Sequence, residues 1–177
     1  MALTLDVDAL KAAIRDVPDF PKPGIVFKDI TTLLQDADLF RVAGDLMADL
    51  CRTHPADKVV AIESRGFILG GLLADRLGLG FVPVRKPGKL PAKTLKATYA
   101  LEYGTDTLEI HADALAPGER VLVVDDVIAT GGTAKAVAEL CQKLGARVSA
   151  FAFLIELGFL DGRAKLAGQE VLSLIRY

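Results

Sequence analysis

The sequence Val-Leu-Val-Val-Asp-Asp-Val-Ile-Ala-Thr-Gly-Gly-Thr, from Val121 to Thr133, combines an apolar strand pattern with a polar turn. Its first residues are apolar and mostly β-branched, as in strands that are buried on both faces of a parallel sheet. Two aspartates follow at the expected carboxyl edge of the strand. A turn of small residues then leads into helical periodicity between Val137 and Leu144. The stretch therefore predicts a strand, an acidic pair, a turn and a helix.

The turn in this stretch has the composition of an anion-binding site. Its residues are Ala129, Thr130, Gly131, Gly132 and Thr133. It would offer a phosphate group the backbone N–H groups of a helix N-terminus, two hydroxyls, and close approach at the glycines. Hydrogen bonds to a charged group contribute about 1.5–3 kcal/mol each, whereas the helix dipole contributes about 0.3–2 kcal/mol in all. The amides should therefore dominate phosphate binding.

The two acidic residues before the turn, Asp125 and Asp126, suit a different part of a ligand. Carboxylates would repel a phosphate group, but they accept hydrogen bonds from sugar hydroxyls and bind hydrated metal ions. The chain has no Gly-x-x-x-x-Gly-Lys-Ser/Thr pattern, and no Gly-x-Gly-x-x-Gly follows a predicted strand, so nucleotide cofactors are not indicated. A phosphorylated sugar fits both the acidic pair and the turn.

Length and composition predict one globular domain, residues 1–177, with 51% hydrophobic and 25% charged residues. The formal net charge of −2 argues against general nucleic-acid binding. No window approaches the roughly 18 apolar residues that a membrane span needs. Cys51 and Cys141 lie among helical apolar positions outside any Cys-x-x-Cys pair, which predicts buried free thiols in a reducing compartment. The first residues carry no basic run before an apolar block, so a cytoplasmic location is expected.

Strand and helix patterns alternate along the chain. Besides the strand that begins at residue 120, strands are expected at 58–63, 80–85, 147–155 and 171–175, and helices at 6–15, 39–50 and 67–77. Asp36 or Asp38 would cap the second of these helices, and Pro83 would place its strand at a sheet edge or a bulge. The alternation predicts an α/β fold with a central, mainly parallel, twisted sheet flanked by helices.

Polar residues follow three of the predicted strands, at residues 63–65, at Arg85 and Lys86, and at the acidic pair. Ligands bind at this edge of parallel sheets, so one pocket bordered by all three is the simplest arrangement. From Arg85 to Lys96 the chain carries basic residues and no acidic one. This loop is either a solvated surface or a site that attracts a polyanion, and the small net charge of the chain favours the second reading.

Two further segments border the predicted sheet. Residues 98–110 alternate around a Gly-Thr-Asp sequence, which predicts a hairpin or a mobile flap. Residues 18–24 are rich in proline and should be extended on the surface, followed by the apolar residues 25–30. This N-terminal segment is either a connector or one wall of a pocket, and the residues alone leave both possibilities open. A helical turn is expected at residues 160–167.

These motifs resemble those of the type I phosphoribosyltransferases. Residues 121–133 are similar to the family signature for binding 5-phospho-α-D-ribose 1-diphosphate (PRPP), and the likeness extends to residues 18–30, 63–67, 85–91 and 101–104. Within the family, the likeness is to members that act on adenine, and it covers nearly the whole chain. It implies the family fold, with residues 1–34 as an N-terminal helix and hood and residues 94–111 as a flexible flap.

The resemblance implies that adenine and PRPP react in the presence of Mg²⁺ to give AMP and pyrophosphate. Asp125 and Asp126 would bind the ribose hydroxyls, and the turn at 129–133 would bind the 5′-phosphate. Substrate binding is also implied for residues of the hood, the turn after the strand at 58–63, the basic loop and the flap, namely Val26, Phe27, Lys28, Ser64, Arg65, Arg85, Lys86, Lys89 and Tyr103. Substrate and water, rather than protein ligands, would hold most of the Mg²⁺ coordination shell. Glu102 is the candidate catalytic residue, which would bind or protonate the base at N7 as the C–N bond forms.

Two other functions are compatible with the same PRPP site. The chain would be a 6-oxopurine phosphoribosyltransferase, using xanthine or hypoxanthine and guanine, if the hood selected a different base. A PRPP-sensing regulator without catalysis is the other alternative, although no winged-helix segment or basic nucleic-acid face is visible in the sequence. The family implies a homodimer in which Arg85 reaches the site of the partner. No nucleic-acid or membrane partner is expected.

Overall fold

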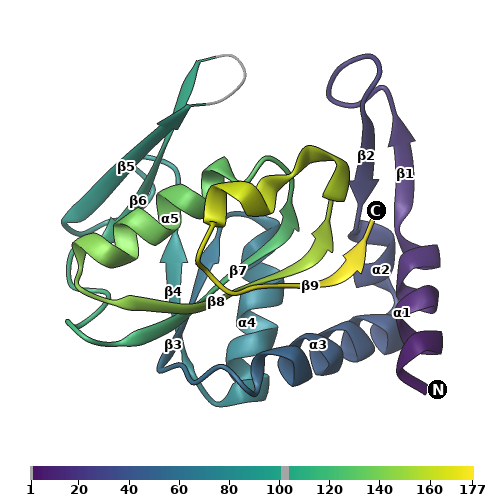
Figure 1. The fold of residues 1–177 in the computed structure, drawn as a ribbon, viewed down its shortest axis with the longest axis horizontal. Coiled ribbons are helices and arrows are strands. Elements are labelled where there is room, and N and C mark those ends of the chain that lie inside the picture. The colour runs from purple at the N-terminus through teal and green to yellow at the C-terminus, as the bar shows by residue number, and fades with distance from the viewer. Residues whose placement is uncertain (1, 101–103) are drawn as a thin grey trace. The chain divides into compact units, whose positions relative to one another are not determined.

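The computed structural model describes residues 2–100 and 104–177, which form two compact units, Met1–Leu46 and Met47–Tyr177. The second unit contains a five-stranded sheet in the order β4-β3-β7-β8-β9, in which every neighbouring pair is parallel (Figure 1). Its strands are β3 (Lys58–Ile62), β4 (Gly80–Val84), β7 (Arg120–Ile128), β8 (Arg147–Glu156) and β9 (Val171–Arg176). The predicted parallel α/β fold is confirmed, and Pro83 lies in an edge strand as expected.

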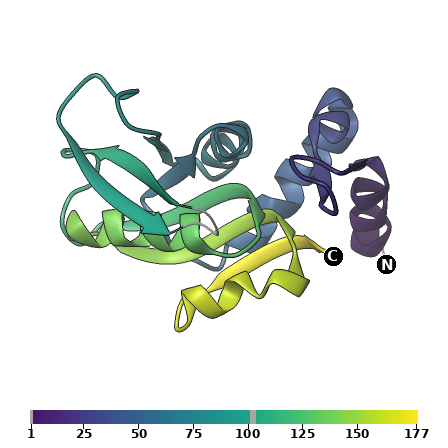
Figure 2. The same ribbon diagram turned by 90° about the horizontal axis from the view of Figure 1, so that it is seen from above.

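Helices cover both faces of this sheet (Figure 2). Helix α4 (Arg65–Leu77) packs on β3 and β7, and helix α5 (Gly132–Lys143) packs on β7 and β8 from the opposite side. Residues 121–124 of the central strand are completely buried between these layers. The apolar run that begins the quoted stretch therefore forms the middle of the core, as its composition predicts.

The central strand β7 is longer than the sequence predicts. It continues through the two aspartates to Ile128, because Val127 pairs with Ile155 and Ile128 with Glu156 of β8. On its other side, the pairing with β3 ends at Val124. The prediction that the acidic pair lies at the end of the strand is therefore wrong for the pairing with β8, which continues past both aspartates. It is right for the pairing with β3, which ends before them.

The rest of the second unit flanks this sheet. Strands β5 (Thr94–Ala100) and β6 (Thr105–His111) form an antiparallel hairpin, which confirms the hairpin expected at residues 98–110. Two short 3₁₀ helices, η1 (Gly158–Leu160) and η2 (Gly162–Leu166), replace the single helical turn expected at 160–167. Cys51 and Cys141 are both buried and free, as predicted, and burial raises the pKa of their thiols to about 11 and about 12.

The first unit contains helix α1 (Ala2–Ala13), strands β1 (Arg15–Pro18) and β2 (Val26–Asp29), helix α2 (Thr31–Gln35) and the beginning of helix α3 (Ala37–Cys51). Strands β1 and β2 form an antiparallel hairpin that the sequence reading missed. Proline at 18 had suggested an extended connector, but a two-stranded hairpin consists of edge strands, where a missing N–H is tolerated. Asp36 caps α3 as expected, since its Oδ1 accepts the N–H groups of Asp38 and Leu39, each at 3.0 Å.

Among residues 2–100 and 104–177, no helix has the length and apolar character to cross a membrane.

Candidate active site

The acidic pair of β7 contacts the beginning of helix α4. Asp126 is only 5% exposed, and its carboxylate accepts a hydrogen bond from Nε of Arg65. Asp125 Oδ1 accepts the backbone N–H of Asp126 at 2.9 Å. Burial, together with the negative charge of Asp126, raises the pKa of Asp125 well above its ordinary value. The two neighbouring carboxyls therefore have different surroundings, since Arg65 Nε donates directly to Asp126.

Helix α4 approaches this pair through a glycine. A Cβ atom at Gly66 would lie 2.7 Å from Asp125 Oδ1 and 3.2 Å from Asp125 Cα, so no side chain fits there. The residue before Arg65 is Ser64, and the Glu63–Ser64 peptide bond is cis. The turn between β3 and α4 thus places Arg65 and Gly66 directly against the acidic pair.

The turn after β7 surrounds a small cavity. Helix α5 begins at Gly132, and Gly131 before it has φ +76°, a backbone conformation that favours glycine. The cavity has a volume of about 90 Å³ and is lined by Asp125, Phe153 and residues 127–134. The structure therefore brings all five turn residues and one of the two aspartates to the same cavity, with a helix N-terminus facing it.

Two buried carboxylates hold the basic loop that follows β4. Glu63 accepts hydrogen bonds from Arg85 Nε at 2.8 Å, Lys86 N at 3.1 Å and Lys89 Nζ at 3.0 Å. Burial raises the pKa of Glu63, but the bonds from Arg85 and Lys89 outweigh it and keep the pKa below its ordinary value. Glu109, which is 3% exposed, accepts Gly88 N at 3.1 Å. These contacts gather the loop cations beside the end of β3.

A chain of hydrogen bonds connects the basic loop with the turn at residues 129–133, which is called the phosphate turn below. Lys86 Nζ pairs with Asp106 on β6, and the hydroxyl of Tyr99 on β5 donates to the same carboxylate at 3.2 Å. Thr133 Oγ1 in turn donates to the Tyr99 hydroxyl at 3.3 Å. The hairpin β5–β6 therefore lies between the two predicted anion sites and contacts both.

The remaining predicted site residues belong either to the first unit or to the part of the chain that the structure does not describe. Val26, Phe27 and Lys28 are on β2 in the first unit, where Val26 is 49% exposed and Phe27 packs edge-to-face on Phe20 at 5.2 Å. Lys28 pairs with Asp16 at 2.6 Å across the β1–β2 hairpin. Glu102 and Tyr103 lie outside the residues that the structure describes.

Sequence reasoning missed the carboxylates that organise the basic loop. Asp106 and Glu109 belong to a hairpin strand and were not assigned to the site. Glu63 was expected to border the pocket, but not to hold the basic loop. One signal was present, because a run of cations with no acid between Arg85 and Lys96 requires counter-charges from other segments. The identity of those segments depends on strand pairing, which residue spacing does not reveal.

The close contact of Gly66 with Asp125 leads to a testable expectation. A Gly66→Ala substitution would displace the acidic pair, and misplacement of about 1 Å can reduce catalytic efficiency by about 10²-fold. We expect kcat/KM for PRPP to fall by about 10- to 100-fold in steady-state assays. Gly71→Ala is the matched control, since it adds the same methyl group to α4 at a position with no atom within 4 Å. Equal activity of both variants would show that the contact at Gly66 has no functional role.

Comparisons with known proteins identify the family of the chain. Residues 29–170 match the family described as "Phosphoribosyl transferase domain". An adenine phosphoribosyltransferase of Desulfitobacterium hafniense (strain Y51) is 59% identical over 164 residues, which cover 93% of this chain and 95% of that protein. The crystal structure of adenine phosphoribosyltransferase from Thermoanaerobacter pseudethanolicus superimposes with a TM-score of 0.95 at 54% identity, covering 97% of this chain and 99% of the other. The Saccharomyces cerevisiae enzyme, solved with adenine and an imino-altritol bisphosphate, gives a TM-score of 0.90 at 42% identity. The superposition covers 97% of this chain and 99% of the yeast chain.

Proposed function

Since this chain belongs to the adenine phosphoribosyltransferases of the phosphoribosyl transferase domain family, we propose that the residues at the ends of β3, β4 and β7 bind PRPP in two parts. The reaction of the chain is the conversion of adenine and PRPP to AMP and pyrophosphate, a step of purine salvage. The single observation that supports the divided site best is the shared cavity of Asp125 and the phosphate turn, linked by hydrogen bonds to the basic loop.

The first part of the site holds the ribose 5-phosphate group. Residues 129–133 bind the 5′-phosphate through backbone N–H groups and two threonine hydroxyls, because the turn lies at the N-terminus of α5. Asp125 and Asp126 accept hydrogen bonds from the 2′- and 3′-hydroxyls of the ribose. Arg65 donates a hydrogen bond to Asp126 and fixes the direction of its carboxylate.

The second part holds the pyrophosphate group. Ser64, Arg65, Arg85, Lys86 and Lys89 surround it with hydroxyl, guanidinium and ammonium donors, which stabilise the leaving group as negative charge develops on it. Glu63 positions Arg85 and Lys89 by direct hydrogen bonds. The C1–O bond to pyrophosphate breaks while the purine N9 forms its bond to C1 from the other face, so no nucleophilic side chain is needed.

The adenine side of the site involves the hood and the flap. Val26, Phe27 and Lys28 of the hood border the base, and backbone groups distinguish a 6-amino from a 6-oxo purine. Glu102 binds the base at N7 and exchanges a proton there as the C–N bond forms, and Tyr103 contributes to substrate binding. The proposal also includes the domain organisation of the chain. Residues 1–177 form one domain, in which residues 1–34 are the hood and residues 94–111 are a flexible flap.

Magnesium accompanies PRPP in this proposal. No group of three or more His, Cys, Asp or Glu side chains that could hold a metal ion occurs within residues 2–100 and 104–177. The donor set that is present, two carboxylates beside a site for a polyphosphate, suits Mg²⁺, which keeps several waters and binds through substrate oxygens. When bound, the ion neutralises charge on the pyrophosphate oxygens. No protein ligand is assigned to Mg²⁺. The proposal also places the enzyme in the cytoplasm.

A homodimer belongs to the same proposal. Ile68 on α4 and Phe81 on β4 are 44% and 41% exposed, and Phe67 packs edge-to-face on Phe81 at 5.8 Å. The Arg85 guanidinium lies 5.9 Å from the centre of the Phe67 ring, so this apolar surface adjoins the basic loop. A second copy that covers this surface would bring Arg85 of the first copy close to the site of the second. Sedimentation equilibrium should give the mass of two chains, and a one-chain mass would contradict the dimer.

Base selectivity tests the proposed function. Initial rates with adenine, hypoxanthine, guanine and xanthine would be measured at saturating PRPP and Mg²⁺. We expect kcat/KM for adenine to exceed the others by at least about 10⁴-fold, because a site built to pair a polar group rejects an analogue that leaves its partners unpaired. Equal or better turnover of a 6-oxopurine would overturn the choice of base. Binding of nucleic acid without any turnover would instead support a PRPP-sensing regulator.

A further inference from the structure

The phosphate turn rests directly on the segment that follows β8. A Cβ atom at Gly131 would lie 2.2 Å from the carbonyl oxygen of Gly162, and a Cβ atom at Gly162 would lie 2.3 Å from the carbonyl oxygen of Ala129. Both distances are too short for any side chain, so the two backbones touch through glycines on each side. A shift of Gly162 therefore acts on the turn without an intervening side chain that could adjust.

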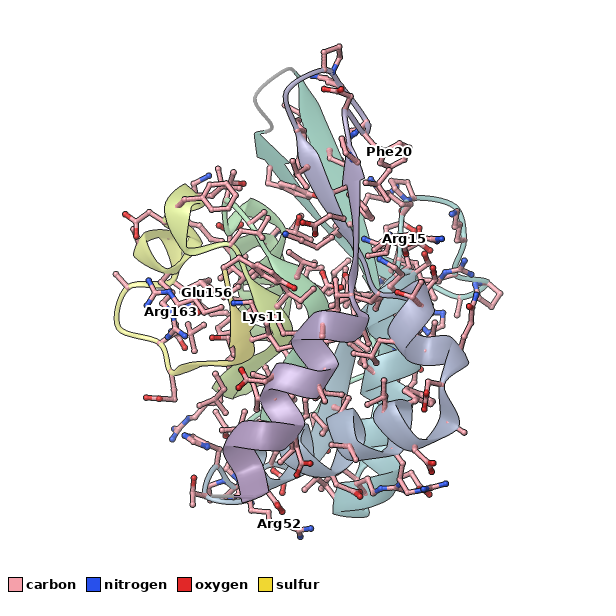
Figure 3. All side chains as sticks on the ribbon, turned by 90° about the vertical axis from the view of Figure 1, so that its right-hand side faces the viewer. Lys11, Arg15, Phe20, Arg52, Glu156 and Arg163 are labelled. Atoms are coloured by element: carbon pink, nitrogen blue, oxygen red, sulfur yellow. The ribbon has the colours of Figure 1, made fainter. Side chains whose placement is uncertain are left out.

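The residue after Gly162 is fixed by an ion pair between a buried carboxylate and an arginine whose side chain is 41% exposed. Glu156, at the end of β8, is 4% exposed, and it accepts Arg163 Nε at 2.8 Å and Arg163 Nη2 at 2.7 Å (Figure 3). This is the two-point arrangement in which arginine and a carboxylate restrict each other most. Ser173 Oγ donates to the same carboxylate at 2.5 Å, and Arg163 Nη1 donates to the carbonyl of Val171 at 2.6 Å. Arg163 thus connects the ends of β8 and β9 to η2.

The ion pair between Glu156 and Arg163 contributes to folding stability. Through its arginine, the pair can also act on the turn at residues 129–133. Glu156 is buried, so removal of its arginine partner would leave an uncompensated charge and cost stability. Arg163 of this pair directly follows Gly162, the glycine whose backbone touches the turn. Its guanidinium has four geometrically defined acceptor contacts, which restrict the position of the backbone at 162–163.

We propose that Arg163 is a positioning residue for the phosphate turn: its ion pair with Glu156 holds Gly162 against Ala129 and Gly131 and so sets the backbone amides that bind the 5′-phosphate of PRPP. This inference rests on the proposed assignment of residues 129–133 to that phosphate. Neither Glu156 nor Arg163 touches the substrate in this arrangement. Their effect is expected on binding of the ribose 5-phosphate part and not on adenine.

The Arg163→Met variant tests this role, since it keeps most of the side-chain volume and removes the guanidinium. We expect KM for PRPP and the Kd of AMP to rise about 10-fold or more, the equivalent of one hydrogen bond to a charged group. KM for adenine and the Kd of pyrophosphate should stay within about twofold. Arg163→Lys, which restores a charge but not the two-point contact, should recover part of the loss. Arg176→Met is the matched control, because Arg176 is 69% exposed and its Nε lies 3.7 Å from Glu156.

The measurements separate positioning from stability. A purely structural role would lower the melting temperature and the active fraction with KM for PRPP unchanged, and that result would overturn the inference. The Gly162→Ala variant perturbs the contact with the turn in a second way, because it leaves the ion pair in place. It should also raise KM for PRPP. A Thr130→Val and Thr133→Val double variant tests the turn itself. If its AMP affinity equals that of the unmodified protein, the assignment of the turn fails and the inference with it; if only the Arg163 variants lack an effect, the inference alone fails.

Discussion

The double substitution Asp125→Asn and Asp126→Asn is expected to lower kcat/KM for PRPP by about 10²- to 10⁴-fold. Each carboxylate is proposed to accept a ribose hydroxyl, and hydrogen bonds to a charged group contribute about 1.5–3 kcal/mol each. The substitution also removes the charge with which Asp126 holds Arg65. Steady-state kinetics with PRPP as the varied substrate would measure the loss. The Asp75→Asn variant on α4, whose carboxylate is 79% exposed, should retain full activity.

The stability of the single Asp125→Asn variant separates a binding role from a structural one. Burial and the neighbouring charge raise the pKa of Asp125 in the folded state above its unfolded value. Its contribution to stability is therefore fully present only below the unfolded pKa of 3.8 and is lost as the pH rises through the folded pKa. At pH 7 the raised pKa of Asp125 therefore counts against the stability of the fold, so Asp125→Asn should melt at a higher temperature while losing activity. A lower melting temperature together with lost activity would indicate that Asp125 is needed mainly for folding.

The Glu102→Leu substitution is expected to lower kcat by about 10²- to 10⁴-fold, the usual contribution of a positioned acid or base. PRPP binding should change little, because Glu102 is proposed to contact only the base. Single-turnover rates and the Kd of PRPP would be measured separately, since KM alone does not isolate binding. Glu102→Gln would keep a hydrogen-bonding group and lose the titratable proton, so it should be more active than the leucine variant and should lose the pH dependence of kcat. An unchanged kcat in Glu102→Leu would remove this residue from the mechanism.

The sequence predicted most of the sheet because its strands are apolar and its helices carry clear periodicity. Burial of residues 121–124 on both faces follows directly from four consecutive apolar side chains. The end of the same strand could not be predicted, because Val127 and Ile128 extend it only through their pairing with β8. The β1–β2 hairpin was missed for a related reason: Pro18 signalled an irregular segment, and only the pairing partner Val26 makes it a strand end.

The candidate site could be predicted where its residues are contiguous and not where they meet through the fold. The turn from Ala129 to Thr133 and the two aspartates before it are local in sequence, so their chemistry was visible. The partners Glu63 and Asp106, which hold the basic loop, come from β3 and β6. Gly162, which supports the turn from a segment about thirty residues later, carries no signal of its own in the sequence. Such contacts depend on tertiary packing and appear only once the strands are in register.

The central claim is that the aspartates and the turn after β7 form the ribose 5-phosphate half of a divided PRPP site. A crystal structure of the chain with AMP would test it most directly. The account predicts the 5′-phosphate in the cavity lined by residues 127–134, within hydrogen-bonding distance of the turn amides, and the ribose hydroxyls on Asp125 and Asp126. A phosphate bound at the Arg85–Lys89 loop instead, with the cavity after β7 empty, would contradict the claim.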